Sequence, residues 1–217
     1  RLGGLDPYSA SKSAVELVTQ SYRALFKKQN KSLSVASARA GNVIGGGDWC
    51  EYRLIPDIIR SLISGISIEV RNPNSIRPWQ HVLEPLSGYL WLGAQLWQKS
   101  EGLNGEAFNF GPDAHVNQTV TELLSAMATR WPGAQWDVPE GYKQGGYEAT
   151  LLKLSCDKVL FYLNWRAVLQ FPETVAFTAD WYRAWHQSHQ DIFTYTVDQI
   201  EQYCQLAQVR GASWIQL

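Results

Sequence analysis

Residues 7–47 carry the pattern that decides the fold class: PYSASKSAVELVTQSYRALFKKQNKSLSVASARAGNVIGGG. Apolar side chains recur at helical spacing, which predicts a helix over 8–29 with Asp6 as a plausible cap. The repeating positions are Ala14, Leu17, Val18, Tyr22, Leu25 and Phe26. A short β-prone run follows and ends in glycines. This order of helix, strand and glycine-rich loop is typical of α/β proteins, in which ligands bind at the carboxyl ends of parallel strands.

The remainder of the chain alternates in the same way. Helices are predicted at 53–65, 83–100, 119–131, 156–163 and 172–190, and through 195–208 in the tail. A strand, a turn at Asn72–Asn74 and a return are predicted within 66–82. Further strands are predicted at 106–112 and 149–155. The sequence shows no internal repeat, so the fold class is α/β without a solenoid.

Composition and charge limit the kinds of partner. The net charge is −1 and the longest basic run is Lys27–Lys28, which argues against nucleic acid and against an anionic membrane surface. Three scattered cysteines fit free thiols in a reducing cytosol better than disulfides or zinc. His186 and His189 have the spacing of a helical pair but lack further ligands nearby, so no metal is expected. We therefore expect a cytoplasmic protein.

Tyr8 and Lys12 stand four residues apart, so their side chains share one face of the predicted helix. A phenol has a pKa of roughly 10, and a nearby ammonium favours its ionised form. Such a pair can accept a proton from a sugar hydroxyl while hydride leaves the same carbon. The same spacing also occurs in ordinary surface helices, so the spacing alone favours no catalytic role.

The surrounding residues add a family resemblance. PYSASKSAVELV followed by ARAGNVIGGGDW resembles the extended short-chain dehydrogenase/reductase family, which includes NAD-dependent nucleotide-sugar epimerases and dehydratases. RLIPDIIR and IRPWQHVLEPLSGYLWL narrow the resemblance to 4,6-dehydratases that act on a CDP-linked sugar. The resemblance runs from residue 3 to about residue 185. It implies NAD as cofactor, CDP-glucose as the nucleotide-sugar substrate, and a homodimer or higher homo-oligomer.

The resemblance also implies an architecture. Residues 1–48 and 79–111 would be the C-terminal part of an incomplete NAD-binding Rossmann fold. Residues 49–78 and 112–217 would form a smaller α+β domain that binds the nucleotide sugar. Tyr8 would be the catalytic base, and Lys12 would bind the ribose hydroxyls of NAD and assist Tyr8, so both residues would contact the cofactor.

Matching motif positions supply the residues that would hold the substrate phosphates. Asn42 in GNVIGG would lie near the diphosphate. Arg53 and Leu54 begin the second predicted helix, whose N-terminus suits an anion. Arg77 in IRPWQHV would bind the diphosphate, because a guanidinium grips phosphate oxygens in a fork geometry.

Four further positions would contact the nucleotide. Val70 and Arg71 in IEVRNP would wrap the base, and Asn109 in FNFG would lie close by. Tyr147 stands near where related dehydratases usually have a histidine or an arginine. A tyrosine donates one hydrogen bond to a phosphate but carries no positive charge, so substrate affinity would be weakened unless another cation such as Lys143 substitutes.

One expected motif is missing from the sequence. The family's dinucleotide fold opens with a Gly-x-x-Gly-x-x-Gly turn that lets the backbone approach the pyrophosphate, and the printed sequence contains no such turn. We therefore expect this chain to be the C-terminal part of a longer enzyme and to be inactive alone. The alternatives are a non-catalytic remnant that binds nucleotide sugars or pairs with another subunit, and a related epimerase or dehydratase.

Overall fold

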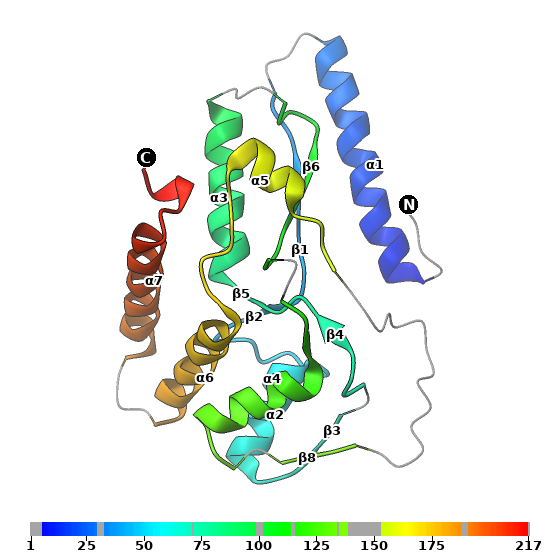
Figure 1. Ribbon diagram of the computed structural model, residues 1–217. Coiled ribbons are helices and arrows are strands. Elements are labelled where there is room, and N and C mark those ends of the chain that lie inside the picture. The colour runs from blue at the N-terminus through cyan, green and yellow to red at the C-terminus, as the bar shows by residue number, and fades with distance from the viewer. Residues whose placement is uncertain are drawn as a thin grey trace.

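The computed structural model describes residues 6–29, 33–70, 72–98, 102–113, 116–133, 135–138, 153–187 and 191–216 (Figure 1). They form an α/β fold. The helices are α1 (Pro7–Lys28), α2 (Leu54–Ser64), α3 (Leu83–Trp97), α4 (Val120–Arg130), α5 (Asp157–Leu163), α6 (Phe171–Gln187) and α7 (Ile192–Val209), followed by the 3-10 turn η1 (Ser213–Gln216). The strands are β1 (Ser37–Ala40), β2 (Val43–Ile44), β3 (Ile68–Glu69), β4 (Ile76–Arg77), β5 (Gln80–His81), β6 (Ala107–Phe110), β7 (Gln118–Thr119) and β8 (Trp136–Asp137).

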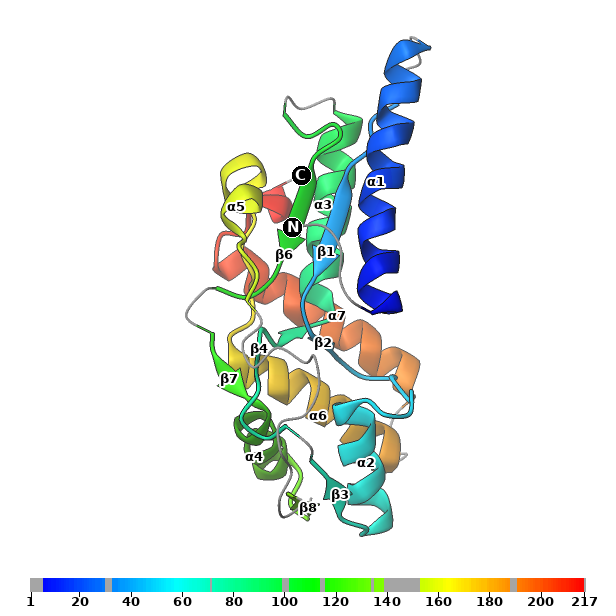
Figure 2. The same ribbon diagram turned by 90° about the vertical axis from the view of Figure 1, so that its right-hand side faces the viewer.

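The strands combine as separate pairs. β1 and β6 are parallel, with Ser37 opposite Ala107 and Ala40 opposite Phe110. β2 pairs with β5 and β3 with β8, both parallel, whereas β4 and β7 are antiparallel. Helix α3 covers one face of the β1–β6 pair and α1 stands on its other side (Figure 1). Figure 2 shows α2, α4, α6, β3 and β8 gathered at one end of this pair.

Apolar side chains form separate clusters that follow this arrangement. One cluster unites α2, α4 and α6 around Ile59, Leu123 and Tyr182, all fully buried. A second packs α3 and α5 against β6 through Phe108 and Phe110. A third lies between α6 and α7. The predicted division of the chain into two domains stays a prediction.

The predicted helices are confirmed, and local signals explain where they begin. Asp6 accepts a hydrogen bond from the Ser9 backbone N–H at 2.9 Å, as expected for the cap of α1. At α4, Thr119 and Glu122 form a reciprocal capping box. These contacts satisfy backbone donors that the first helical turn leaves without partners.

Two expectations about strands need correction. The turn at 72–74 is present, but β3 and β4 do not return on each other: β3 pairs with β8 and β4 with β7. Of the strand predicted at 149–155, residues 149–152 lie outside the described residues, and 153–155 have no strand conformation. Strand β8 lies in a region for which no strand was predicted, because two residues are too few to show a period. Within the described residues, no helix has both the length and the apolarity that a membrane crossing requires.

A buried carboxylate fixes the position of α7. Glu84 is 1% exposed and accepts hydrogen bonds from the backbone N–H groups of Val168 and Leu169 and from the Tyr203 hydroxyl at 2.9 Å. The Tyr203 hydroxyl also lies 3.0 Å from the Ser87 hydroxyl oxygen. Burial raises the pKa of Glu84 to about 7 although these hydrogen bonds lower it.

This raised pKa predicts a dependence of stability on pH. The ordinary pKa of a glutamate is 4.5, so the folded protein holds the Glu84 proton more tightly than the unfolded chain does. The contribution of Glu84 to the free energy of unfolding therefore falls as pH rises from 4.5 towards 7. Burial lowers the pKa of His81 to about 4. The contribution of His81 to the free energy of unfolding therefore rises with pH, opposite to that of Glu84. We therefore compare wild type with Glu84→Gln by urea unfolding, since His81 is common to both. Relative to the variant, the free energy of unfolding of the wild type should fall by up to about 3 kcal/mol between pH 4.5 and 7.5. A difference that does not change with pH would contradict the prediction.

Candidate functional site

A cavity of about 630 Å³ gathers most of the predicted site residues and is called here the Tyr8 pocket. Residues from the start of α1, the loop after β1, the start of α2, and strands β3 and β4 line it. The predicted site residues in its wall are Tyr8, Asn42, Arg53, Leu54, Val70 and Arg77. Side chains that lie up to 69 positions apart in the sequence thus face one space.

The loop after β1 reaches the pocket because a glycine lets the chain pass another segment closely. A Cβ atom at Gly41 would lie 2.8 Å from Cγ of Pro78. The next residue, Asn42, is held through its carbonyl oxygen, which accepts a hydrogen bond from the Gln80 N–H at 3.0 Å. The loop is therefore fixed at the carboxyl end of β1, where α/β proteins bind ligands.

Two arginines bring positive charge to the pocket in different ways. Arg77 is 6% exposed, and its Nη1 donates a hydrogen bond to the Ile76 carbonyl oxygen at 2.9 Å. Arg53 is the exposed N-cap residue of α2, and no side chain hydrogen bond caps that end of the helix. Its Nη1 lies 3.1 Å from Oδ2 of Asp48. The guanidinium groups and the helix N-terminus suit a diphosphate.

Asp48 is fixed from two sides. Its carboxylate accepts a hydrogen bond from the Cys50 N–H at 3.0 Å, and its backbone N–H and carbonyl oxygen both bond to the Tyr182 hydroxyl. Partial burial on its own would raise the pKa of Asp48, but the hydrogen bonds from Cys50 and Arg53 outweigh it and hold the pKa below its ordinary value. The carboxylate is therefore ionised at neutral pH and can orient Arg53.

Tyr8 and Lys12 share one face of α1 as their spacing predicts. Nζ of Lys12 lies 5.5 Å from the centre of the Tyr8 ring. Tyr8 lines the pocket but is 71% exposed, and Lys12 is exposed and does not belong to the pocket wall. The phenol and the ammonium are thus accessible to a ligand that extends beyond the pocket.

The remaining predicted residues lie elsewhere. The Asn109 side chain donates to the Ser155 carbonyl oxygen at 3.0 Å and accepts from Arg39, and it does not line the Tyr8 pocket. Arg71, Tyr147, Lys143 and His189 lie outside the described residues. The His186 ring lies 5.4 Å from the Trp131 ring at a tilt of 38°, and the described residues contain no group of three or more possible metal ligands.

Sequence reasoning did not single out the other residues of the pocket wall, among them Asp48, Tyr52, Glu69 and Trp79. Asp48 and Trp79 belong to the quoted segments GNVIGGGDW and IRPWQHV, so their neighbours in the sequence pointed to them. Glu69 likewise belongs to the quoted segment IEVRNP, and Tyr52 directly precedes Arg53. That both residues line the same cavity depends on how α2 meets β3.

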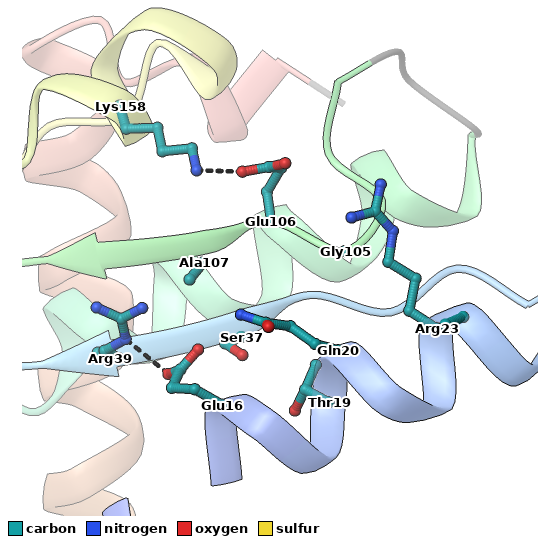
Figure 3. A pocket seen from close by; sticks show the side chains of 11 residues that line it. Glu16, Thr19, Gln20, Arg23, Ser37, Arg39, Gly105, Glu106, Ala107 and Lys158 are labelled. Atoms are coloured by element: carbon teal, nitrogen blue, oxygen red, sulfur yellow. Dashed lines mark hydrogen bonds and ion pairs between the residues drawn. The ribbon is translucent and has the colours of Figure 1, made fainter. Parts of the chain in front are cut away.

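A second cavity, of about 690 Å³, separates α1 from the β1–β6 pair (Figure 3). Glu16, the only described residue of α1 that is buried, forms an ion pair with Arg39 of β1 at 2.7 Å. Further along the helix, Arg23 lies over Gly105, where a Cβ atom would be 1.9 Å from Cδ of the arginine (Figure 3). Charged side chains rather than apolar packing thus hold α1 against the strands here.

Glu16→Ala is expected to lower the free energy of unfolding by about 1 kcal/mol, since it removes the carboxylate that Arg39 contacts and Arg39 itself is partly hydrated. Urea unfolding would measure this, and limited proteolysis would test whether α1 becomes easier to cleave. Gln20→Ala, an exposed position one turn further along α1, is the control. Equal losses in both variants would contradict an anchoring role for Glu16.

The fold and the pocket define an α/β protein with an arginine-containing cleft beside a Tyr-x-x-x-Lys helix, and comparison with known proteins gives its family. The chain belongs to the NAD dependent epimerase/dehydratase family, whose model matches residues 2–129. It is 42% identical over 189 residues to the CDP-glucose 4,6-dehydratase of Salmonella typhimurium, covering 85% of this chain and 52% of that protein. It is 28% identical over 179 residues to a dTDP-glucose 4,6-dehydratase of Streptomyces antibioticus, covering 82% and 49%.

Solved structures share the fold. A dTDP-glucose 4,6-dehydratase of Bacillus anthracis in complex with NAD superposes with a TM-score of 0.62 at 18% identity, covering 84% of this chain and 54% of that one. A UDP-glucose-4-epimerase of Stenotrophomonas maltophila with bound NAD gives 0.68 at 17% identity, covering 86% and 57%. The chain thus spans about half the length of the relatives that it matches.

Proposed function

We propose that the Tyr8 pocket binds the diphosphate of a nucleotide sugar and that the chain serves CDP-glucose 4,6-dehydration. The observation that carries the proposal is the convergence of Asn42, Arg53, Leu54 and Arg77 on one cavity that Tyr8 also lines. Two guanidinium groups and an uncapped helix N-terminus favour a dianionic phosphate group over a neutral ligand. The 42% identity to a CDP-glucose 4,6-dehydratase supports the choice of sugar nucleotide.

The residues present fit one end of NAD. Tyr8 and Lys12 offer an exposed hydroxyl and an exposed ammonium on one helix face, which suit the hydroxyls of the nicotinamide ribose. The printed sequence has no glycine-rich turn for the pyrophosphate of the cofactor. In this proposal the chain therefore contributes the ribose contacts of NAD and the substrate pocket.

Tyr8 is proposed to act as the phenolate and take the proton of the sugar 4-hydroxyl, which leaves a neutral phenol, and the Lys12 ammonium to stabilise the phenolate before that transfer. Arg53 and Arg77 hold the diphosphate so that the sugar lies towards Tyr8. Tyr8 and Lys12 would hold the nicotinamide ribose of NAD, which would supply a reversible hydride acceptor for the oxidation at C4 and the reduction at C6 that accompany loss of water across C5 and C6. The overall change is CDP-glucose to CDP-4-keto-6-deoxyglucose and water, with no net change in the cofactor.

The first experiment is to titrate the purified 217-residue chain with CDP-glucose by calorimetry and to assay it with CDP-glucose and NAD⁺ by mass spectrometry. We expect binding without turnover, because the sequence contains no turn for the NAD pyrophosphate. Failure to bind CDP-glucose would overturn the proposed pocket. Formation of a product lighter by one water would show that the 217 residues suffice for the chemistry.

A further inference from the structure

The Tyr8 pocket continues into a second space. A hollow of about 750 Å³ is lined by α2, the two residues Glu51 and Tyr52 before it, and residues 66–69 at β3, and is called here the α2 hollow. Four residues, Tyr52, Leu54, Asp57 and Glu69, line both the hollow and the Tyr8 pocket. They therefore form the border between the two spaces.

Given the proposed function, the border indicates which end of a bound nucleotide sugar lies towards Tyr8 and which lies towards the α2 hollow. Tyr8, Asn42 and Arg77 line the Tyr8 pocket and not the α2 hollow. If the sugar lies towards Tyr8 and the diphosphate beside Arg53 and Arg77, the nucleoside extends away from Tyr8. The base then reaches the border at Tyr52 and Glu69.

Tyr52 combines a strained backbone conformation with an exposed aromatic side chain, as expected for a residue that contacts a ligand. Its backbone φ is +62°, a left-handed conformation that is unfavourable for a bulky side chain and that asparagine or glycine adopts more readily. Its ring is 89% exposed, so packing within the described residues does not explain the strained conformation. Strained residues of this kind gather at binding sites, and an exposed aromatic ring provides a surface on which a base can stack.

Glu69 brings a hydrogen-bond acceptor to the same border. It ends β3, where the adjacent Val70 N–H donates to the Asp137 carbonyl oxygen at 2.8 Å and fixes the strand. An ionised carboxylate only accepts hydrogen bonds and has about four acceptor positions. It therefore suits the exocyclic amine of cytosine and disfavours the carbonyl oxygen that uracil and thymine carry at the same ring position.

We propose that Tyr52 and Glu69 read the base of the nucleotide sugar: Tyr52 stacks on the ring, and Glu69 accepts a hydrogen bond from the 4-amino group of cytosine. The proposal rests on the proposed function of the Tyr8 pocket. It assigns the choice of CDP over UDP to a single carboxylate at the pocket border.

Calorimetric titration of the whole chain with CDP and with UDP tests the role of Glu69. Wild type should bind CDP about tenfold more tightly than UDP. Glu69→Gln should bring the two affinities close together, because a glutamine amide can turn either an acceptor to cytosine or a donor to uracil. Glu51→Gln, in the α2 hollow but outside the Tyr8 pocket, should keep the preference. An unchanged preference in Glu69→Gln would overturn the proposal.

Three variants test Tyr52. Tyr52→Asn and Tyr52→Ala should weaken CDP and UDP binding equally, by about tenfold, whereas Tyr52→Phe should bind normally. The thermal midpoint of Tyr52→Asn should stay the same or rise, because asparagine tolerates the left-handed conformation. A Tyr52→Asn variant that binds CDP normally, or that loses affinity only together with thermal stability, would overturn the stacking role.

The same titrations distinguish the proposed recognition of the base from the proposed function of the Tyr8 pocket, on which it rests. If wild type binds CDP and UDP equally and Glu69→Gln changes nothing, the reading of the base is wrong while the diphosphate pocket stands. If wild type binds neither nucleotide, the proposed function is itself wrong, and the reading of the base falls with it.

Discussion

Tyr8→Phe is expected to lower the turnover of CDP-glucose by about 10²–10⁴-fold, the usual contribution of a general base. The substitution removes only the phenolic oxygen, so the shape of the ring and its distance from Lys12 are kept. The suitable protein joins this chain to the part of the Salmonella typhimurium relative that it does not cover, since the chain spans 52% of that relative. Mass spectrometry of the product, with and without the substitution, measures the change.

Two controls make this result specific. Tyr22→Phe alters another exposed tyrosine of α1 and should leave turnover unchanged. CDP-glucose should bind to Tyr8→Phe as it does to the unsubstituted protein, because the proposed diphosphate contacts lie at other residues. A Tyr8→Phe protein that keeps more than a tenth of the turnover would exclude Tyr8 as the base. A joined protein that binds CDP-glucose and NAD⁺ without any turnover would favour the non-catalytic alternative.

Arg77→Ala is expected to weaken CDP-glucose binding by roughly tenfold to a hundredfold, the range for a lost hydrogen bond to a charged group. Arg77 is buried at the pocket wall, where its charge is less screened by water than that of exposed Arg53. Calorimetry measures the affinity directly. Arg53→Ala should cost less, because Arg53 is exposed and water already solvates its guanidinium group.

The controls for Arg77 separate binding from stability. Arg77→Lys keeps the positive charge but loses the fork geometry, so it should restore part of the affinity. Arg183→Ala changes a partly exposed arginine of α6 outside the Tyr8 pocket and should bind normally. Urea unfolding of each variant shows whether it is folded under the binding conditions. A folded Arg77→Ala protein with unchanged affinity would exclude Arg77 from the diphosphate contacts.

The helices were predictable because their signals are local. The spacing of apolar residues, the Asp6 cap and the Thr119–Glu122 capping box all act within one or two turns. The shared face of Tyr8 and Lys12 follows from the same helical geometry. The pairing of β3 with β8 did not follow, since a two-residue strand carries too little pattern to choose between its neighbour and a segment 68 positions away.

The candidate site was predictable only in part. Most of its residues came from a family resemblance, and the structure brings six of them to one cavity. Asn109 lies apart, because its side chain is held by Ser155 and Arg39. That Tyr52 and Glu69 lie together at one border emerged only from the fold, since this border depends on the approach of α2 to β3.

The comparison of α1 with α4 shows where sequence information ends. Both helices repeat apolar residues at helical spacing, and the sequence alone determined that both are helices. Leu123, Leu124 and Met127 of α4 are buried, whereas Leu17 and Val18 of α1 are more than half exposed. A helix is set by hydrogen bonds within one segment, so local sequence suffices. Burial needs a second surface, and only the tertiary structure decides whether one lies opposite.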